Sequence, residues 1–378
     1  MKLPEIMFAL SGGVWRLQRC WPSLDDSLPP AVKRIIVEAT PMHGDRSRRH
    51  AALLSVNPLL PEEAQWLRLH PYGQDAALPA LTGHLQHALR DDPSAVVVAH
   101  RRGKRAVIRS VHGFIKVLRP GKAPALVHRQ ACAARYYGGH AVLAALLQHD
   151  DAALITAPLA GRTLAELGND PSLDDGGLAG CWFAFGSMMR RCQRELPADW
   201  CGLPQHRLED EWRIVDDWLM RMMLSGQVPP ERVLVLHQRS QQLCGALAGE
   251  GVVPLSLLHR DLHDKQVLFT PDGPALLDFD TLALGDAALD LGNVLAHLRL
   301  RAYQHAWCSG LEPSLSFTRF RLARQALLNG WAPDEASMAR ANLFTELSWI
   351  RLTGVYQWRP AWQKMAKHMV QADDHQGL

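Results

Sequence analysis

Apolar runs divide the chain into a first part that favours strands and a long second part that favours helices. Near the N-terminus, two such runs flank a polar turn that contains glycine, which predicts neighbouring strands at 34–39 and 51–56. Pro61 opens a short helix, because proline is tolerated in the first helical turn. A second helix is expected at 78–89. Residues 1–92 are therefore predicted to form an N-terminal α/β extension or a small cap.

A strand-rich pattern begins at about residue 93. Short turns separate β-branched and apolar runs, which is typical of an antiparallel meander. These runs lie at 95–99, 106–109 and 113–118. A helix is then expected at about 125–147, and a strand at 154–156 is ended by Pro158. We expect residues 93–158 to form one small antiparallel lobe.

From Arg162 onward, apolar residues recur mostly at helical spacing. The helix predicted over 209–224 places large apolar residues on one face, namely Trp212, Val215, Leu219 and Met222. Two strand-like runs at 266–269 and 275–277 interrupt this pattern and surround a turn that contains Pro271 and Gly273. The predicted fold class is α+β, with a mostly helical lobe at 159–378.

Composition excludes several classes of protein. Apolar residues make up 47% of the chain and charged residues 21%, as in ordinary globular proteins. The net charge of +3 gives no reason to expect a nucleic-acid partner, and no run approaches the roughly 18 apolar residues of a membrane span. The seven cysteines form no C-x-x-C pair, which favours reduced thiols and a cytoplasmic location.

Candidate chemistry flanks the predicted hairpin. Asp261 and Gln266 stand five positions apart in the segment His-Arg-Asp-Leu-His-Asp-Lys-Gln, and Asp278 follows the returning strand in Leu-Leu-Asp-Phe-Asp. A hairpin of this length brings Asp278 back beside Gln266, so that both can reach one Mg²⁺, which prefers oxygen ligands. Asp280 is a second acid for the same ion. Asp261 would orient a hydroxyl group and take its proton, as phosphoryl transfer from ATP requires.

These motifs resemble the aminoglycoside phosphotransferase and choline kinase superfamily. The resemblance rests on His259–Gln266, on Leu276–Asp280 and on the string Gly-Asp-Ala-Ala-Leu-Asp-Leu-Gly-Asn at 285–293, and it covers roughly residues 93–300. The basic first hairpin and the Phe-Ile-Lys strand are also similar to bacterial maltokinases of the same superfamily. The resemblance implies a protein-kinase-like two-lobed fold and assigns to Asp286 the role of bracing the catalytic loop.

The resemblance also implies how ATP is bound. Lys116, on the third strand of the meander, corresponds to the lysine that contacts the phosphates. The basic turn with Gly103 and Arg105 would cover the phosphates. The linker between the lobes, with Thr156 and Ala157, would bind adenine through backbone groups. The implied cofactors are ATP and Mg²⁺, and the implied partner is a small-molecule hydroxyl acceptor.

Two departures from the family pattern keep other functions open. Residues 117–149 contain no Asp or Glu, although kinases place there a Glu that pairs with the lysine. Gln130, His128 or Asp278 could take its place. Gln266 stands where the family usually has Asn. These departures motivate an alternative, a nucleotide-binding pseudokinase or scaffold with little transfer activity. A third hypothesis is an enzyme that transfers a different part of the nucleotide.

The sequence leaves the acceptor open among a sugar, an aminosugar, an aminoglycoside and an amino alcohol. An acidic run at 209–211 could meet an amino-sugar cation, or could be the favourable negative first turn of a helix. Tryptophans of the C-terminal part could stack on sugar rings or pack in the core. After Asp278 the chain is expected to enter a helix directly, without a segment that docks protein substrates.

Overall fold

We describe a computed structural model of the chain, which covers residues 2–22, 33–56, 65–251, 253–310 and 318–372. The first unit is an antiparallel sheet in the order β1-β2-β3-β4-β5. Its strands are β1 (Ile6–Phe8), β2 (Val14–Pro22), β3 (Lys33–Pro41), β4 (His50–Val56) and β5 (Trp66–Leu69). The predicted pair of strands is confirmed in β3 and β4. The short helix expected at Pro61 lies outside the described residues.

A second sheet, in the order β10-β11-β8-β7-β6, forms the small lobe. Its strands are β6 (Val96–Arg101), β7 (Arg105–Ser110), β8 (Gly113–Leu118), β10 (Leu146–His149) and β11 (Ala153–Thr156). The predicted meander is confirmed in β6, β7 and β8. Helix α1 (Ala80–Asp91) packs on this sheet, where Leu81 and Leu85 share a core with Val97 and Ile108. The helix expected at 78–89 is therefore present, and it joins the small lobe.

Helix α2 (Ala123–Tyr137) is shorter than predicted, since the expectation of a helix to residue 147 is wrong. The chain leaves the helix at Gly138, and Gly139 adopts a left-handed conformation with φ +81°. Glycine adopts this conformation without a steric penalty. The following residues form β9 (Val142–Leu143) and β10. Strand β9 pairs with the distant residues 275–276, and β10 pairs with β11 after the next turn.

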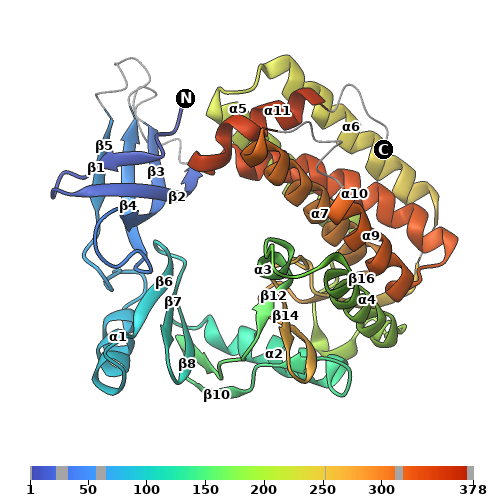
Figure 1. Ribbon diagram of the computed structural model, residues 1–378, viewed down its shortest axis with the longest axis horizontal. Helices are drawn as coiled ribbons and strands as arrows, with labels where there is room; N and C mark the ends of the chain where they lie inside the picture. Colours follow the sequence, from blue (N-terminus) through green and yellow to red (C-terminus); the bar gives the residue numbers. More distant parts are fainter. Residues whose placement is uncertain (1, 23–32, 57–64, 252, 311–317, 373–378) are drawn as a thin grey trace.

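The remaining chain is mostly helical, as predicted, and forms the large lobe (Figure 1). Its helices are α3 (Leu164–Gly168), α4 (Asp175–Cys192), η2 (Trp200–Gly202), α5 (Leu208–Ser225), α6 (Pro230–Gly249), α7 (Ala288–Ser309), α9 (Thr318–Trp331), α10 (Glu335–Tyr356), η3 (Pro360–Trp362) and α11 (Gln363–Ala372). The described part of these helices includes none that is long and apolar enough to cross a membrane. Val215, Leu219 and Met222 are buried on α5 as expected, whereas Trp212 is half-buried.

The segment 259–282, which is predicted to carry the chemistry, lies among short strands. The predicted hairpin is confirmed as β14 (Val267–Thr270) and β15 (Gly273–Leu276), which pair with each other and with β12 (Arg162–Thr163) and β9. Strands β13 (Leu255–Leu258) and β16 (Ala283–Asp286) pair on either side of this segment. The expectation that the chain enters a helix directly after Asp278 is wrong, because β16 comes first.

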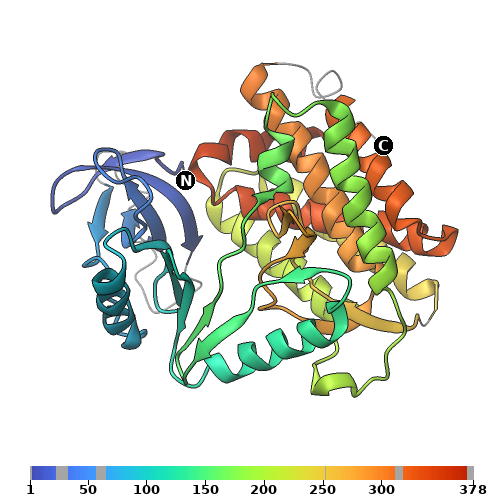
Figure 2. The same ribbon diagram turned by 60° about the horizontal axis from the view of Figure 1, so that its bottom comes forward.

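The N-terminal sheet contacts both lobes. On the side of the small lobe, the Glu38 carboxylate of β3 accepts a 2.8 Å hydrogen bond from the His100 amide. On the side of the large lobe, the Cys20 amide of β2 donates to the carbonyl of Trp358 at 3.0 Å, and Trp358 is buried in the core of the sheet. Figures 1 and 2 show this sheet beside the small lobe and next to the last helices. It therefore connects the two lobes by a route separate from the linker.

Candidate active site

An ion-pair cluster forms where the small lobe meets the hairpin. The Lys116 Nζ atom of β8 donates to Asp278 Oδ1 at 2.9 Å and to Asp280 Oδ1 at 2.6 Å. The Arg105 Nη1 atom of β7 donates to Asp280 Oδ2 at 2.7 Å. The structure thus brings together four of the predicted site residues from two lobes.

Local backbone geometry explains how Asp278 reaches this cluster. The Leu277 amide donates to the Gln266 carbonyl at 2.9 Å, which closes the hairpin and sets Gln266 opposite the residue before Asp278. Asp278 then adopts φ +60°, a left-handed conformation that is uncommon outside glycine and that aspartate adopts more readily than most residues. This turn ends the strand and directs the carboxylate away from the hairpin. The predicted approach of Asp278 to Gln266 is confirmed.

Charge balance in the cluster is uneven between the two acids. Burial opposes the charge on Asp278, but Lys116 and Arg105 outweigh it and hold the pKa of Asp278 well below its ordinary value. For Asp280, burial and the charge of Asp278 prevail over Lys116, so its pKa is raised. Burial also disfavours the charge on Lys116, yet the two acids raise its pKa. Lys116 and Asp278 therefore stay charged, and Asp280 is the acid that takes up a proton most readily.

Lys116 takes its acidic partners from the hairpin and not from the following helix. Gln130 of α2 donates to the Ala144 carbonyl at 3.1 Å, and the His128 ring lies 2.7 Å from the Cys201 carbonyl. Neither side chain takes the place of the missing acid. Asp278 and Asp280 supply the carboxylates that this lysine requires.

Asp290 braces the catalytic loop. Its two carboxylate oxygens accept hydrogen bonds from the amides of His259 and Arg260 at 2.7 and 2.8 Å. The His259 ring nitrogen Nε2 in turn donates to the Leu277 carbonyl at 2.7 Å, and Arg260 has φ +68°. A buried acid at the start of α7 thus fixes the start of the loop, and His259 links it to the residue before Asp278.

The role assigned to Asp286 is therefore wrong. Asp286 ends β16 and accepts two hydrogen bonds from Arg340, from Nε at 2.7 Å and from Nη2 at 2.6 Å. It also accepts from the Ala288 amide, which starts α7. The sequence signal for this brace was Asp290, the second acid of the motif at 285–293, which lies about one helical turn after Asp286.

Asp261 lies in this loop with its side chain 46% exposed, and His263 Nε2 is 4.0 Å from its Oδ1 atom. The neighbouring residue Asp264 is buried and accepts both Nε and Nη2 of Arg301 at 2.7 and 3.0 Å. Burial and three nearby acids act on Arg105: burial lowers its pKa, but Asp278, Asp280 and Asp261 together raise it. Asp261 thus shares one electrostatic environment with the ion-pair cluster.

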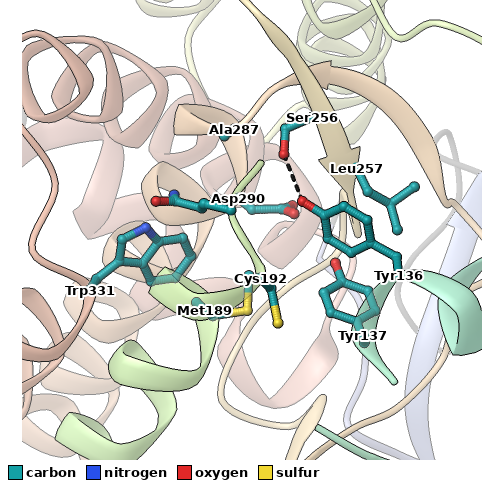
Figure 3. A pocket seen from close by; sticks show the side chains of 10 residues that line it. Tyr136, Tyr137, Met189, Cys192, Ser256, Leu257, Ala287, Asp290 and Trp331 are labelled. Atoms are coloured by element: carbon teal, nitrogen blue, oxygen red, sulfur yellow. Dashed lines mark hydrogen bonds between the residues drawn. The ribbon is translucent and has the colours of Figure 1, made fainter. Parts of the chain in front are cut away.

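A small cavity lies behind the loop (Figure 3). It measures about 10 Å³ and is lined by Asp290, Tyr137 and Trp331 among others, while Tyr136 and Ser256 hydrogen-bond across it at 3.0 Å. This volume is near the lower limit for one water molecule. The cavity is therefore part of the packing that supports Asp290 and is too small for a substrate.

The other residues expected to contact ATP lie on or next to strands of the sheet that carries Lys116. Gly103 has φ +66° in the β6–β7 turn, and its amide donates to Asp75 Oδ2 at 2.7 Å. Thr156 ends β11, and the Ala157 amide already donates to the Ala145 carbonyl at 2.8 Å. The Ala157 amide is therefore already paired, which leaves its carbonyl oxygen as the backbone group of this residue that could contact a nucleotide base.

The donor set fits a hard divalent cation. Two aspartates and one glutamine offer carboxylate and amide oxygens, which are the ligands that Mg²⁺ prefers. The negative charge of Asp278 also raises the cost of ionising Asp280. A cation there would relieve this repulsion. Among the described residues, a second group, His263, Asp264 and His297, has ligand atoms within 4.8 Å of one another, but Arg301 already neutralises Asp264.

Two open questions about the acceptor are answered by packing. Glu211 is buried and pairs with His206 at 2.9 Å, and Asp210 pairs with Arg213 at 2.7 Å and caps α5. Two of the three acids in the run at 209–211 are therefore already paired. Trp349 and Trp358 are 0% and 2% exposed, so these tryptophans pack in the core and do not offer a platform to a sugar.

Comparison with known proteins agrees with this geometry. A model of the phosphotransferase enzyme family (APH) matches residues 82–338, and the chain belongs to this family. No curated protein matches the chain.

Solved structures with a similar fold come from small-molecule kinases. Amicoumacin kinase hAmiN, in complex with AMP-PNP, Ca²⁺ and Ami, is 13% identical with a TM-score of 0.52, covering 77% of this chain and 93% of that one. A choline/ethanolamine kinase family protein from Mesorhizobium loti is 15% identical, with a TM-score of 0.51 and coverage of 78% and 95%. A glucosamine kinase is 16% identical, with a TM-score of 0.49 and coverage of 96% and 94%. The predicted kinase-like two-lobed fold is confirmed.

Proposed function

We propose that the protein is an ATP- and Mg²⁺-dependent phosphotransferase that phosphorylates a hydroxyl group of a small molecule. The observation that carries the proposal is the convergence of Lys116, Arg105, Asp278 and Asp280 beside the loop of Asp261. Phosphoryl transfer needs cations on the phosphates, oxygen ligands for a metal and a carboxylate near the acceptor. This chain supplies all three from its own side chains.

On the donor side, Lys116 and Arg105 bind the phosphates of ATP, and the turn at Gly103 lies over them. Gly103 suits this turn because its φ of +66° is favourable for glycine. Thr156 and Ala157 contact the adenine base through backbone groups, with the Ala157 carbonyl as acceptor. Asp278, Asp280 and Gln266 hold Mg²⁺, which neutralises charge that develops on the transferred phosphoryl group.

On the acceptor side, Asp261 orients the hydroxyl group and accepts its proton. The acceptor oxygen forms a bond to the γ-phosphorus as the bond from that phosphorus to the β,γ-bridging oxygen breaks, so that ADP leaves with the electron pair. The proton passes from Asp261 to solvent after transfer. Its half-exposed side chain gives Asp261 access both to the acceptor and to water.

We further propose the division of the chain into an N-terminal unit at 1–92, a small lobe at 93–158 and a large lobe at 159–378. Helix α1 lies at the end of the first unit and packs on the sheet of the small lobe. A cytoplasmic location is also proposed. It is supported by seven cysteines that form no disulfide bond, as expected in a reducing compartment.

The test is transfer of phosphate from ATP to a panel of sugars, sugar acids, aminosugars and amino alcohols, followed by mass spectrometry of the products. We expect a product whose mass has increased by one phosphoryl group, formed only with Mg²⁺. Asp278→Ala should abolish it, whereas Asp272→Ala, at the exposed tip of the same hairpin, should not. ATP consumption without any phosphorylated acceptor would overturn the proposal.

A further inference from the structure

Cationic side chains from four elements meet at the end of β2. Arg19 is an exposed residue of β2 itself. The Arg101 guanidinium of β6 lies over the ring of Trp21 at 5.1 Å, and the Arg221 Nη1 atom of α5 donates to the Pro22 carbonyl at 3.2 Å. Arg359 follows Trp358, whose carbonyl accepts from the Cys20 amide. We call these four residues the arginine cluster.

Among the described residues, little negative charge compensates the arginine cluster. In the described part of the chain, Arg101 and Arg359 form no ion pair with a carboxylate. Arg19 lies 3.9 Å from Glu38, which Arg49 shares at the same distance, and Arg221 is 4.0 Å from the exposed Asp217. Stacking on Trp21 and Trp218 holds two of the guanidinium groups without neutralising them. The cluster thus offers planar hydrogen-bond donors that match carboxylate or phosphate.

The cluster borders the proposed reaction centre. Arg101 is paired across the strands with Arg105, which binds Asp280. Burial and Arg19 lower the pKa of Arg359 to about 10. Mutual repulsion of this kind is relieved when an anion binds.

We infer that the acceptor is anionic and that the arginine cluster binds its carboxylate or phosphate group while a hydroxyl group faces Asp261. The inference rests on the proposed function and narrows it, because a cationic aminosugar or amino alcohol would be repelled from this face. In the acidic run at 209–211, which might have held such a cation, Glu211 already pairs with His206 and Asp210 already pairs with Arg213. The N-terminal sheet therefore contributes to acceptor recognition through Arg19 and Trp21.

Kinetics on a charge-matched panel test this inference. Glucose, glucosamine, glucuronate and glucose 6-phosphate share one ring and differ in charge, and the last two separate carboxylate from phosphate recognition. The variants are Arg359→Gln and Arg101→Gln, with Arg213→Gln, an exposed arginine of α5, as the matched control. We expect phosphorylation to favour an anionic acceptor, and its KM to rise about tenfold in either cluster variant, the equivalent of one charge-assisted hydrogen bond. KM for ATP should stay unchanged in Arg359→Gln, which lies outside the turn proposed to cover ATP, and the melting temperature should stay unchanged in both cluster variants.

A binding measurement keeps the inference testable if none of these sugars is a substrate. Inorganic phosphate is titrated by calorimetry into the protein saturated with AMP-PNP and Mg²⁺, so that the nucleotide site is filled. Phosphate should bind to wild type and to Arg213→Gln, and about tenfold more weakly to Arg359→Gln. Equal binding by all variants, preference for glucose or glucosamine, or an effect of Arg359→Gln on KM for ATP alone would each overturn the inference and leave phosphotransfer intact. Transfer to no compound in any class would instead count against the proposed function.

Discussion

At the scale of single residues, the site depends on one lysine that serves two acids. Lys116 lies on a strand whose pattern was readable from the sequence, and Asp278 and Asp280 follow a hairpin of predictable length. The approach of Asp278 to Gln266 was predictable because the length of the hairpin fixes the distance between them. That Asp280 would bind both Lys116 and Arg105 was not, because the contact joins two lobes whose relative position no local pattern encodes.

Asp278 should matter more for metal binding than Asp280. Lys116 and Arg105 keep the pKa of Asp278 low, so it is the acid that remains charged. We expect Asp278→Asn to raise the Mg²⁺ concentration for half-maximal activity by about tenfold or more, and Asp280→Asn to raise it less. The measurement is initial rate against Mg²⁺ concentration at saturating ATP. An unchanged Mg²⁺ dependence in Asp278→Asn would remove this residue from the proposed ligands.

The acidic brace of the loop gives a second residue-scale prediction. Asp290→Ala removes the acceptor of two buried amide hydrogen bonds, each costing about 1–3 kcal/mol when left unpaired. Asp290→Asn keeps one acceptor oxygen and should cost less. Urea denaturation of the two variants measures this order. Equal stability of Asp290→Ala and wild type would show that the loop does not depend on this contact.

At the scale of elements, prediction succeeded where a strand or helix is defined by its own sequence. Strands β6, β7 and β8 and the hairpin strands β14 and β15 are short runs rich in apolar residues, and the turns between them contain glycine. It failed at α2, where Gly138 and Gly139 end the helix inside an apolar stretch and the next residues join sheets through distant partners. The prediction from sequence also missed β1, β2 and β5. In β2, polar residues interrupt the apolar pattern.

The catalytic loop is held to α7 by the pair Asp264 and Arg301, and this contact predicts a pH dependence. Burial opposes the charge on Asp264, yet Arg301 depresses its pKa below the ordinary value. A depressed carboxyl pKa stabilises the fold above the unfolded pKa of about 3.9, and this stabilisation is lost as pH falls through lower values.

Asp264→Asn leaves Arg301 buried without its charge partner and should cost about 3–5 kcal/mol at pH 7. Below about pH 4 the difference from wild type should shrink by roughly 1.4 kcal/mol per pH unit, because wild type progressively loses the contribution of this carboxylate. Urea denaturation at several pH values follows both. A difference that stays constant from pH 7 to pH 3 would refute the electrostatic origin.

At the scale of the whole molecule, the N-terminal sheet joins the two lobes beside the site. Its core includes Trp358 of the large lobe, and its strand β3 reaches the small lobe through Glu38 and His100. His100 lies 3.2 Å from Asp75, which also accepts from the Gly103 amide. The sheet is thus linked by buried contacts to the turn that is proposed to cover ATP. Such long-range contacts leave no periodic signal in a sequence.

Trp358→Ala should weaken this junction. Removing a fully buried tryptophan costs about 3–5 kcal/mol of folding stability. The Cys20 amide donates to the Trp358 carbonyl. In the variant, this amide should exchange its hydrogen faster than the amides of β8. Hydrogen exchange followed by mass spectrometry compares the two strands. Equal acceleration in both would indicate global destabilisation and not a local opening of the junction.

The central claim is most directly tested by the product formed from ATP and an accepted small molecule in wild type and Asp261→Asn. The Asp261 side chain is half-exposed, so folding and melting temperature should be retained. We predict phosphorylated product from wild type and a fall in kcat of about 10²–10⁴-fold in the variant. A loss smaller than about tenfold, with the fold intact, would contradict a phosphotransfer reaction that depends on this carboxylate.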